Sequence, residues 1–283
     1  MNRTADVVII GAGVIGSSTA FELSKRGYKT LNIDKLPASG YGSTSNSCAI
    51  VRAHYSTWDG VAMAYEGFFY WDDWQNYLDV EDERGLAKYM KTGSIMFMLK
   101  GEDHSKKSLK LFQEIGVEHE IWDLDTLKEK MPIYSHDWYD GISRPDEDEN
   151  FWEKTDEQIE GAVYTPGSGY VSDPQLSTHN LQVAAEAKGG EFLFDAEVME
   201  IRQSNGRIEG VTMKSGEQID CRALVNVAGP HSFVINRMAG VEDDMNIKTK
   251  ALRHEVHHVP SPPGFDFEQN GMHNNKTPSG ALS

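Results

Sequence analysis

Residues 6–16 read DVVIIGAGVIG, and this stretch decides the fold. Its first half, residues 6–10, is a short run rich in β-branched side chains, which predicts a strand buried on both faces. The second half is a G-x-G-x-x-G pattern, and the helical pattern behind it runs as far as Gly27. A second strand is predicted over residues 30–33, and it ends at Asp34.

Each glycine of this pattern has a physical role. Gly11 allows the tight turn, Gly13 lets a pyrophosphate approach the backbone, and Gly16 lets the helix pack closely on the strand. Phosphates then meet the helix N-terminus, where free N–H groups and the dipole favour negative charge. Asp34 stands where an acid accepts hydrogen bonds from ribose hydroxyls. The sequence therefore predicts an adenine dinucleotide site, which nicotinamide dehydrogenases and flavoproteins both use.

A loop of small and polar residues follows the second strand. Residues 42–55 read GSTSNSCAIVRAHY. Such a loop can pass close to a large flat cofactor, with N–H and hydroxyl donors free to meet its oxygens. Arg52 follows at once, and its planar guanidinium can donate two hydrogen bonds to a carboxylate. A structural ion pair is the alternative role for Arg52.

The composition is that of an acidic globular chain. Its 283 residues allow about two domains. Lys+Arg 27 against Asp+Glu 44 gives a net charge of −17, which disfavours nucleic acid and anionic membranes as partners. Acids crowd into residues 137–160, where we expect a solvated insertion. No apolar run approaches the roughly 18 residues of a membrane span.

The cysteines and the N-terminal sequence bear on the cellular compartment of the protein. Cys48 and Cys221 lie in unrelated contexts, so no disulfide framework is predicted. The N-terminus shows no targeting pattern. We therefore expect a reducing, cytoplasmic location.

The rest of the chain mixes helices and strands. Residues 61–78 predict a helix that packs its aromatic face into a core, and an aromatic cage for a methylated amine is the rival interpretation. Residues 93–98 are predicted as a strand, and residues 105–115 and 125–130 as helices.

An antiparallel meander is predicted nearer the C-terminus. Residues 198–203 and 207–213 alternate in polarity around a Ser-Asn-Gly turn, which indicates a hairpin. Residues 223–227 are typical of a buried parallel strand, and Ala228-Gly229 ends it. A meander followed by a parallel strand is not a plain doubly wound order.

These features resemble the FAD-dependent amine oxidoreductases related to D-amino-acid oxidase, and within them the sarcosine oxidase and dimethylglycine dehydrogenase branch. The motifs that carry the resemblance occur in the family's order across nearly the whole chain. They are Gly11-Ala12-Gly13-Val14-Ile15-Gly16, Gly42-Ser43-Thr44, Ile50-Val51-Arg52 with His54-Tyr55, Gly93-Ser94-Ile95, Gly169-Tyr170-Val171 with Asp173-Pro174, Asn226-Val227-Ala228-Gly229-Pro230-His231-Ser232, and Leu252-Arg253-His254.

The resemblance implies an α/β fold: a Rossmann-type FAD-binding domain with an antiparallel β-meander, plus an α+β substrate domain. Residues 1–88 and 158–237 would form the discontinuous FAD-binding domain, and residues 89–157 and 238–283 the substrate domain. Complete relatives continue well beyond the position of Ser283, so the substrate domain is expected to be incomplete.

The resemblance also implies where FAD would be held. Relatives that tether flavin through a loop histidine have it where this chain has Asn46, so non-covalent FAD is expected, and we expect the nearby Cys48 to pack. The expected cofactor contacts are Gly11, Gly13, Val14, Ile15, Gly16, Asp34, Lys35, Gly42, Ser43, Thr44, Ser45, Asn46, Ser47, Val198, Ala228 and Gly229.

The implied reaction oxidises the C–N bond of a small secondary or tertiary amino acid, sarcosine- or dimethylglycine-like, to an imine. Oxygen or another electron acceptor would be the second partner. Arg52 would bind the substrate carboxylate, His54 or Tyr55 would take the amine proton, and His254 would face the substrate pocket. A nicotinamide-dependent dehydrogenase and a non-catalytic dinucleotide-binding fragment stay open as alternatives.

Residues 254–258, HEVHH, match the H-E-x-x-H zinc motif. That motif requires a helix, whereas residues 251–259 alternate as in a strand and run into a proline-rich stretch. In a strand, His254 and His258 would lie about 13 Å apart, too far for one zinc ion. We therefore expect no metal.

Overall fold

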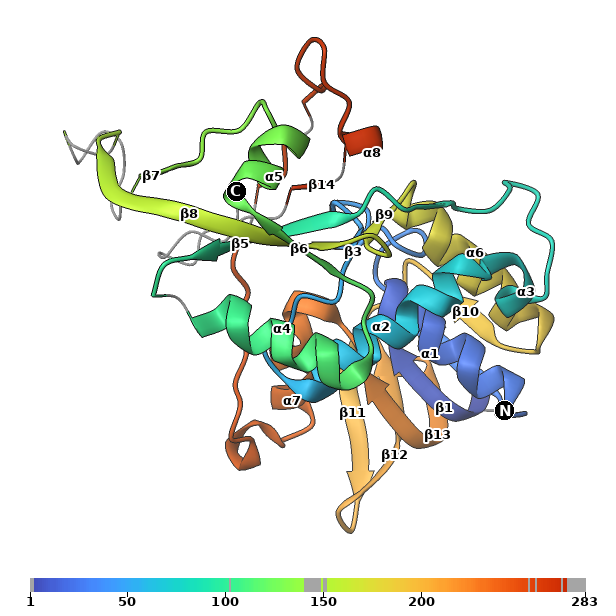
Figure 1. Cartoon of the computed structure of the whole chain (residues 1–283). Helices are drawn as coiled ribbons and strands as arrows, with labels where there is room; N and C mark the ends of the chain where they lie inside the picture. Colours follow the sequence, from blue (N-terminus) through green and yellow to red (C-terminus); the bar gives the residue numbers. More distant parts are fainter. Residues whose placement is uncertain are drawn as a thin grey trace. The chain divides into compact units, whose positions relative to one another are not determined.

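The computed structural model describes residues 3–101, 103–139, 149, 152–253, 255–257, 259–270 and 272–273 (Figure 1). The chain divides into two compact units, and each is assembled from separated segments. Unit 1 comprises Met1–Ala49, Asp73–Lys88 and Val171–His257, and unit 2 comprises Ile50–Asp72, Tyr89–Tyr170 and His258–Ser283.

Unit 1 is built on a six-stranded sheet in the order β10-β2-β1-β13-β12-β11. The first four strands are parallel, and β11, β12 and the start of β13 form the expected antiparallel meander. Its elements are β1 (Arg3–Ile10), α1 (Val14–Lys25), β2 (Thr30–Ile33), α3 (Trp74–Leu78), α6 (Pro174–Ala187), β10 (Glu191–Leu193), β11 (Val198–Ser204), β12 (Arg207–Met213), β13 (Gln218–Asn226), α7 (Ser232–Met238) and the 3₁₀ turns Gly229–His231 and Glu242–Asp244.

Alternation along β1 explains how the sheet is covered. Val8 and Ile10 join an apolar cluster with meander side chains such as Val211, which is fully buried. Helix α1 contacts β1 and β2, and α6 packs on α1 and β10. Ile9 is also fully buried, so β1 is buried on both faces as its β-branched sequence predicts.

The strand register places three chain turns at one edge of this sheet. Ile10 at the end of β1 pairs with Ile33 at the end of β2 and with Asn226 at the end of β13. The residues that follow these three strand ends therefore emerge together. In parallel sheets this carboxyl edge is where ligands bind.

Unit 2 is built on a second sheet in the order β14-β5-β8-β6, with β7 also paired to β8. A small sheet, β3-β9-β4, accompanies it. The elements are β3 (Ile50–Val51), α2 (Trp58–Asp72), β4 (Tyr89–Met90), β5 (Ser94–Leu99), α4 (Asp103–Ile115), β6 (Glu120–Asp123), α5 (Leu124–Lys130), β7 (Asp137–Tyr139), β8 (Lys154–Thr165), β9 (Gly169–Val171), α8 (Phe267–Asn270) and β14 (Met272–His273).

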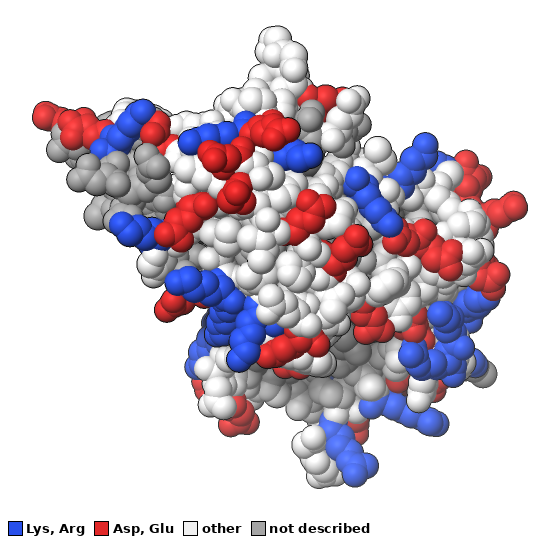
Figure 2. Space-filling view, viewed as in Figure 1, with Lys and Arg blue, Asp and Glu red and all other residues white. Residues whose placement is uncertain are grey.

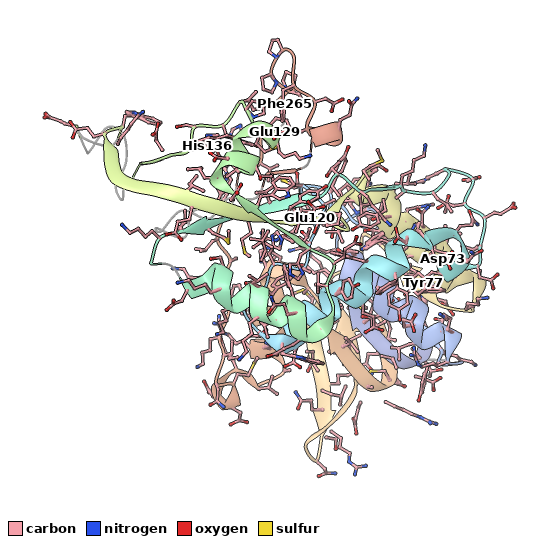
Figure 3. The ribbon with its side chains drawn as sticks, viewed as in Figure 1. Asp73, Tyr77, Glu120, Glu129, His136 and Phe265 are labelled. Carbon is pink, nitrogen blue, oxygen red and sulfur yellow. The ribbon has the colours of Figure 1, made fainter. Side chains whose placement is uncertain are left out.

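Both faces of β5 are buried. Ile95 and Phe97 face a cluster that includes Phe265, which is labelled in Figure 3. Met96 faces the opposite cluster with residues of α2 and α4. Because side chains alternate along a strand, the apolar run of β5 supplies two cores at once.

Several expectations need correction. Residues 61–78 form two helices, α2 and α3, interrupted at Asp73. Their aromatic face is only partly buried: Phe68 is 4% exposed, whereas Phe69 is 59% exposed. The acidic stretch 137–160 is not simply a solvated insertion, because β7 and the start of β8 lie within it.

The unit boundaries also differ from the expected domain boundaries. Residues 158–170 belong to unit 2, where β8 pairs with β5 and β6. Residues 50–72 belong to unit 2 as well, since α2 packs against α4. The segment 238–257, expected in the substrate domain, lies in unit 1. Sequence order alone does not show which sheet a strand joins.

Charged side chains of both signs are interspersed on the face drawn in Figure 2. Among the described residues, no helix is both long and apolar enough to cross a membrane.

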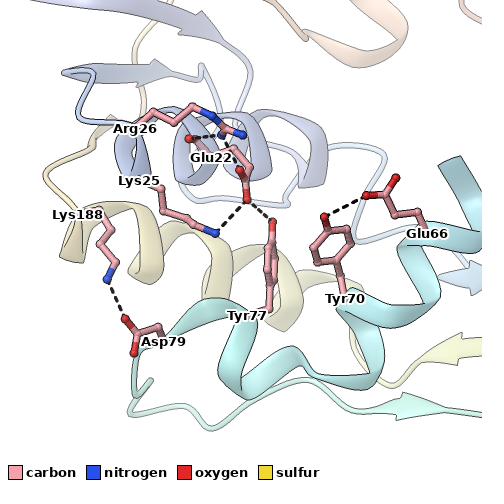
Figure 4. Close-up of polar contacts among 8 residues, drawn as sticks. All are labelled: Glu22, Lys25, Arg26, Glu66, Tyr70, Tyr77, Asp79 and Lys188. Atoms are coloured by element: carbon pink, nitrogen blue, oxygen red, sulfur yellow. Dashed lines mark hydrogen bonds and ion pairs between the residues drawn. The ribbon is translucent and has the colours of Figure 1, made fainter.

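Polar contacts fasten the segment Asp73–Lys88 to the rest of unit 1 (Figure 4). The Tyr77 hydroxyl on α3 donates to Glu22 Oε1 at 3.0 Å, and Arg26 donates to the same carboxylate at 2.6 Å. Burial alone would raise the pKa of Glu22, but the hydrogen bonds from Arg26 and Tyr77 and the nearby Lys25 outweigh it and lower the pKa. The Glu22 carboxylate therefore joins α3 to α1.

Candidate functional site

The glycine-rich turn lies at the carboxyl edge of the unit 1 sheet. Gly11 has a φ of 116°, and a Cβ there would lie 2.3 Å from the Val227 carbonyl oxygen. A Cβ on Gly16 would lie 2.0 Å from the Gly11 carbonyl oxygen. Both glycines are therefore required by the protein's own packing.

Gly13 differs from the other two glycines of the motif. Its backbone φ is −73°, which any residue adopts. A Cβ there would meet only the Thr44 hydroxyl, at 3.1 Å. Packing within the chain therefore constrains this glycine less than the other two, and the approach of a pyrophosphate to its backbone stays a prediction.

The N-terminus of α1 is suited to an anion. The helix has 12 residues, no acid in its first turn and no side-chain cap at Gly13. The N–H groups of the first turn have no acceptor within a helix, and the Val14 N–H donates to Thr44 Oγ1 at 3.2 Å. Ile15, 66% exposed, presents an apolar side chain at the same turn.

Asp34 is held at the end of β2. Its Oδ2 accepts from the Ala12 N–H at 2.8 Å, and its Oδ1 accepts from the Leu36 N–H at 3.0 Å. Each carboxylate oxygen keeps a further lone pair for a hydroxyl donor. The carboxylate is thus oriented by the backbone of the glycine turn itself.

Asn32 supports the glycine turn, and the sequence analysis missed it. It is fully buried in β2, and its amide nitrogen donates to Gly11 O at 3.3 Å and to Gly16 O at 3.0 Å. Among the described residues, its own buried carbonyl oxygen has no hydrogen-bond partner. A polar residue inside the apolar strand TLNI was the signal that could have revealed it.

The loop after β2 contacts the turn at two points. Gly40 N–H donates to Ala12 O at 2.9 Å, and Thr44 reaches Val14 as described. Internal bonds fold the loop, among them Asn46 Nδ2 to Gly42 O at 3.1 Å. The exposed residues of the loop include Ser43, Ser45, Asn46, Ser47 and Cys48.

The other expected cofactor contacts divide into two groups. A Cβ on Gly11 would lie 3.2 Å from Ala228 N, so the Ala228-Gly229 turn adjoins the glycine turn. Lys35 is exposed. It adds to the lowering of the pKa of the Glu197 carboxyl, which comes mainly from the hydrogen bond and charge of Lys214. Val198, in contrast, has its side chain in the apolar core, with 8% exposed.

Arg52 and Tyr55 lie in unit 2. Arg52 is half-buried, and its guanidinium lies 6.0 Å from the centre of the Tyr55 ring. Among the described residues, no carboxylate forms an ion pair with Arg52. Tyr55 is 43% exposed. The guanidinium is therefore available to an external carboxylate, with an aromatic ring beside it.

His54 is placed differently from its neighbours. It is 4% exposed, and its Nε2 lies 3.0 Å from Thr165 Oγ1 and 3.5 Å from Ser94 Oγ. The Thr165 hydroxyl also meets Ser94 Oγ at 3.0 Å and Ser168 Oγ at 2.9 Å. His54 thus belongs to a buried hydroxyl cluster, and direct proton transfer with a substrate is not favoured by this position.

Residues 251–258 contain the H-E-x-x-H sequence and the expected pocket residue His254. His254 and His258 fall outside the described residues. Residues 251–253 and 255–257 form neither a helix nor the expected strand. Arg253 is exposed and pairs with Glu255 at 3.1 Å. Within the described ranges, no group of three or more His, Cys, Asp or Glu side chains is arranged to hold a metal ion.

The fold and the glycine-rich turn define a Rossmann-type architecture of the dinucleotide-binding class. The chain belongs to the FAD dependent oxidoreductase family, whose model matches residues 6–280. FAD is the cofactor of this family, so the match decides against the nicotinamide-dependent alternative.

Individual relatives are distant. The monomeric sarcosine oxidase of Bacillus sp. (strain B-0618) is 23% identical over 241 residues, which are 84% of this chain and 55% of that protein. The mitochondrial pyruvate dehydrogenase phosphatase regulatory subunit of Mus musculus is 25% identical over 256 residues, 88% of this chain and 25% of that protein. The chain thus spans a quarter to about half of the length of these curated relatives.

Solved structures share the fold. L-proline dehydrogenase from P. horikoshii aligns with a TM-score of 0.71 at 19% identity, covering 100% of this chain and 69% of that one. Glycine oxidase from Bacillus cereus ATCC 14579 aligns with a TM-score of 0.60 at 24% identity, covering 84% of this chain and 59% of that one.

Proposed function

We propose that this protein oxidises the C–N bond of a small secondary or tertiary amino acid, sarcosine- or dimethylglycine-like, to an imine. Oxygen or another electron acceptor completes the reaction. The family and the sarcosine oxidase relatives support the reaction class. The observation that carries the substrate class is Arg52, a half-buried guanidinium without a carboxylate partner among the described residues.

The residues of unit 1 fit FAD. The uncovered space at Gly13 and the first-turn N–H groups of α1 suit a pyrophosphate. The Asp34 carboxylate suits the ribose hydroxyls, and Thr44 and the Ala228-Gly229 turn border the same place. When bound, FAD supplies the electron acceptor for the substrate, and the protein supplies binding, orientation and charge.

Arg52 would fix the substrate through its carboxylate. A planar guanidinium binds a carboxylate through two parallel hydrogen bonds, and this orients the C–H bond that is to be broken. Precise orientation matters, since a displacement of about 1 Å can cost about a hundredfold in rate.

The amine must lose its proton before it is oxidised. Of the two proposed acceptors, Tyr55 is the exposed one and lies beside Arg52. We assign it the contact with the amine, directly or through water. His54 is assigned to positioning, because its ring is enclosed by Ser94, Thr165 and Phe112.

A reducing, cytoplasmic location is also proposed for this protein. Both cysteines are free, and Cys48 is exposed. An exposed free thiol is preserved in a reducing compartment such as the cytoplasm.

The test compares substrates with and without a carboxylate. Arg52→Lys keeps the charge but loses the planar fork, and Arg52→Ala loses both. We expect kcat/KM for flavin reduction by sarcosine to fall about tenfold in the first and about a hundredfold in the second. Simple methylamines should be poor substrates of the parent and of both variants alike.

Arg207→Ala is the matched control, because Arg207 is exposed at the β11–β12 hairpin. If Arg52→Ala impairs both substrate kinds equally, the arginine supports the loop or the flavin. The carboxylate contact would then have to lie elsewhere, and Arg253 would be the next candidate despite its pairing with Glu255.

A non-catalytic role is the second candidate. It is favoured by one relative that is named a regulatory subunit and by the limited share of each relative that the chain covers. Under this alternative the protein binds FAD weakly or not at all, and no amine bleaches a flavin absorption band. The same spectroscopic experiment therefore separates the two functions.

A further inference from the structure

A cleft of about 290 Å³ lies in unit 2, and Arg52, His54 and Tyr55 are not among its lining residues. It opens between helix α5 and the segment that leads into β7. Figure 3 labels His136 and, on α5, Glu129. The lining residues are Leu124, Lys128, Tyr134, Ser135, His136 and Asp137.

The walls of the cleft are anchored in a core. Leu127, next to Lys128 on α5, and Met131, directly after the end of α5, are fully buried. The Tyr134 ring lies 6.3 Å from that of Phe97 and 6.2 Å from that of Phe267, centre to centre. The cleft therefore does not need to form around its ligand, which lowers the entropic cost of binding.

His136 leaves hydrogen-bonding capacity unused. Its Nε2 is buried and has no hydrogen-bond partner in the part of the chain that the structure describes, although buried polar atoms in proteins are nearly always paired. Burial and the charge of Lys128 lower the pKa of His136, and Asp137 opposes them. The lowered pKa favours the neutral ring, and its Nε2 meets no hydrogen-bonding group among the described residues.

The charges around the cleft favour an anion. Lys128 is exposed, and no carboxylate of the described residues pairs with it. The acid of the lining, Asp137, is already bound by Lys154 Nζ at 2.5 Å and by Ser135 Oγ at 3.2 Å. The unbalanced charge is therefore the ammonium of Lys128, on a chain whose net charge is −17.

We propose that this cleft binds a small oxyanion, a carboxylate or phosphate group, between the Lys128 ammonium and the His136 Nε2–H. A histidine can donate from Nε2 in its neutral form and from both nitrogens when protonated. A bound anion would therefore accept a hydrogen bond from the buried His136 Nε2–H and would also neutralise the charge of the Lys128 ammonium.

The test follows the His136 imidazole by NMR, with its signal assigned by His136→Gln. The protein is titrated with inorganic phosphate and separately with acetate, at an ionic strength held constant with chloride. We expect a saturable shift in the millimolar range for at least one anion. The bound anion should also raise the pKa of His136, because it stabilises the imidazolium.

Lys128→Met should weaken the binding about tenfold or more. Lys130→Met is the matched control: it removes a lysine of the same helix that does not line the cleft, and it should bind as the parent does. A response to phosphate alone assigns a phosphate site, and a response to acetate alone assigns a carboxylate site. The proposal is overturned if neither anion gives a saturable shift, or if Lys128→Met binds as tightly as the parent.

Discussion

The backbone N–H of Ala12 donates to the Asp34 carboxylate at 2.8 Å. This bond joins the glycine-rich turn after β1 to the end of β2. Asp34 is proposed to bind the ribose, and the glycine-rich turn is proposed to bind the pyrophosphate. The hydrogen bond therefore lets the turn orient the Asp34 carboxylate. Two halves of the dinucleotide site are therefore held in register within the protein.

Asp34→Asn should weaken FAD binding about tenfold or more, since an amide cannot accept both backbone N–H groups and also attract a hydroxyl donor. Flavin fluorescence quenching measures the affinity. Asp6→Asn is the matched control, because Asp6 accepts a single backbone N–H, from Lys29 at 3.0 Å, at the other end of the sheet. Equal FAD affinity in Asp34→Asn and the parent would refute the ribose role.

Gly13→Ala and Gly16→Ala should separate binding from folding. At Gly13 only the Thr44 hydroxyl must yield, so the variant should fold with a near-parental Tm and lose FAD binding. At Gly16 a Cβ would meet a backbone oxygen at 2.0 Å, which should cost about 3 kcal/mol or more of stability. Thermal unfolding and FAD titration report the two effects, and a Gly13→Ala protein that retains FAD would contradict the fit.

Flavin should be released when the protein is denatured in acid. Asn46 offers no nucleophile where a tethering histidine would stand, and its amide is bonded to Gly42 O at 3.1 Å. Fluorescence of the protein band on a denaturing gel detects any covalent flavin. Should the band fluoresce, Cys48→Ser tests whether the exposed thiol carries it.

Thr165→Val should disturb the loop that carries Arg52. The valine keeps the shape but removes the hydroxyl that His54, Ser94 and Ser168 share. We expect a loss of about 1–3 kcal/mol in stability and a rise in KM for sarcosine, with FAD affinity unchanged. Thr165→Ser restores the hydroxyl and should restore KM; if it does not, the cluster does not position Arg52.

The acid stability of unit 1 should depend on Asp82. Its side chain is fully buried and accepts from His179 Nδ1 and Asn180 Nδ2, each at 2.7 Å. Burial alone would raise the pKa of Asp82, but hydrogen bonds from the Arg84 N–H, Asn180 and His179 lower it. Because the folded pKa lies below the unfolded one, the stabilisation is complete above about pH 4 and is lost as the pH falls through the folded pKa.

Asp82→Asn should therefore lower the free energy of unfolding by about 2 kcal/mol near neutral pH. The difference in the free energy of unfolding between this variant and the parent should become smaller as the pH falls below about 4. Asp79→Asn is the control, since Asp79 is exposed and pairs with Lys188 at 3.0 Å (Figure 4); such pairs contribute at most about 1 kcal/mol. A gap that does not change with pH would show that Asp82 acts through shape and not charge.

The sequence by itself determined the features that depend on neighbours along the chain. The strand, turn and helix over residues 3–25 followed from β-branched residues and three glycines, and the β11–β12 hairpin followed from its Asn-Gly turn. Backbone conformations of this kind are dictated by local sterics. The family followed as well, because its motifs occur in a fixed order along the chain.

Only the tertiary structure decided what depends on distant partners. It buried His54 against Thr165 and Ser94, which lie 111 and 40 positions away in the sequence. It turned Asn32 into the support of the glycine turn, and it gave residues 158–165 to unit 2 through the pairing of β8. Burial and hydrogen-bond partners arise from long-range packing, which a residue's type and its neighbours do not encode.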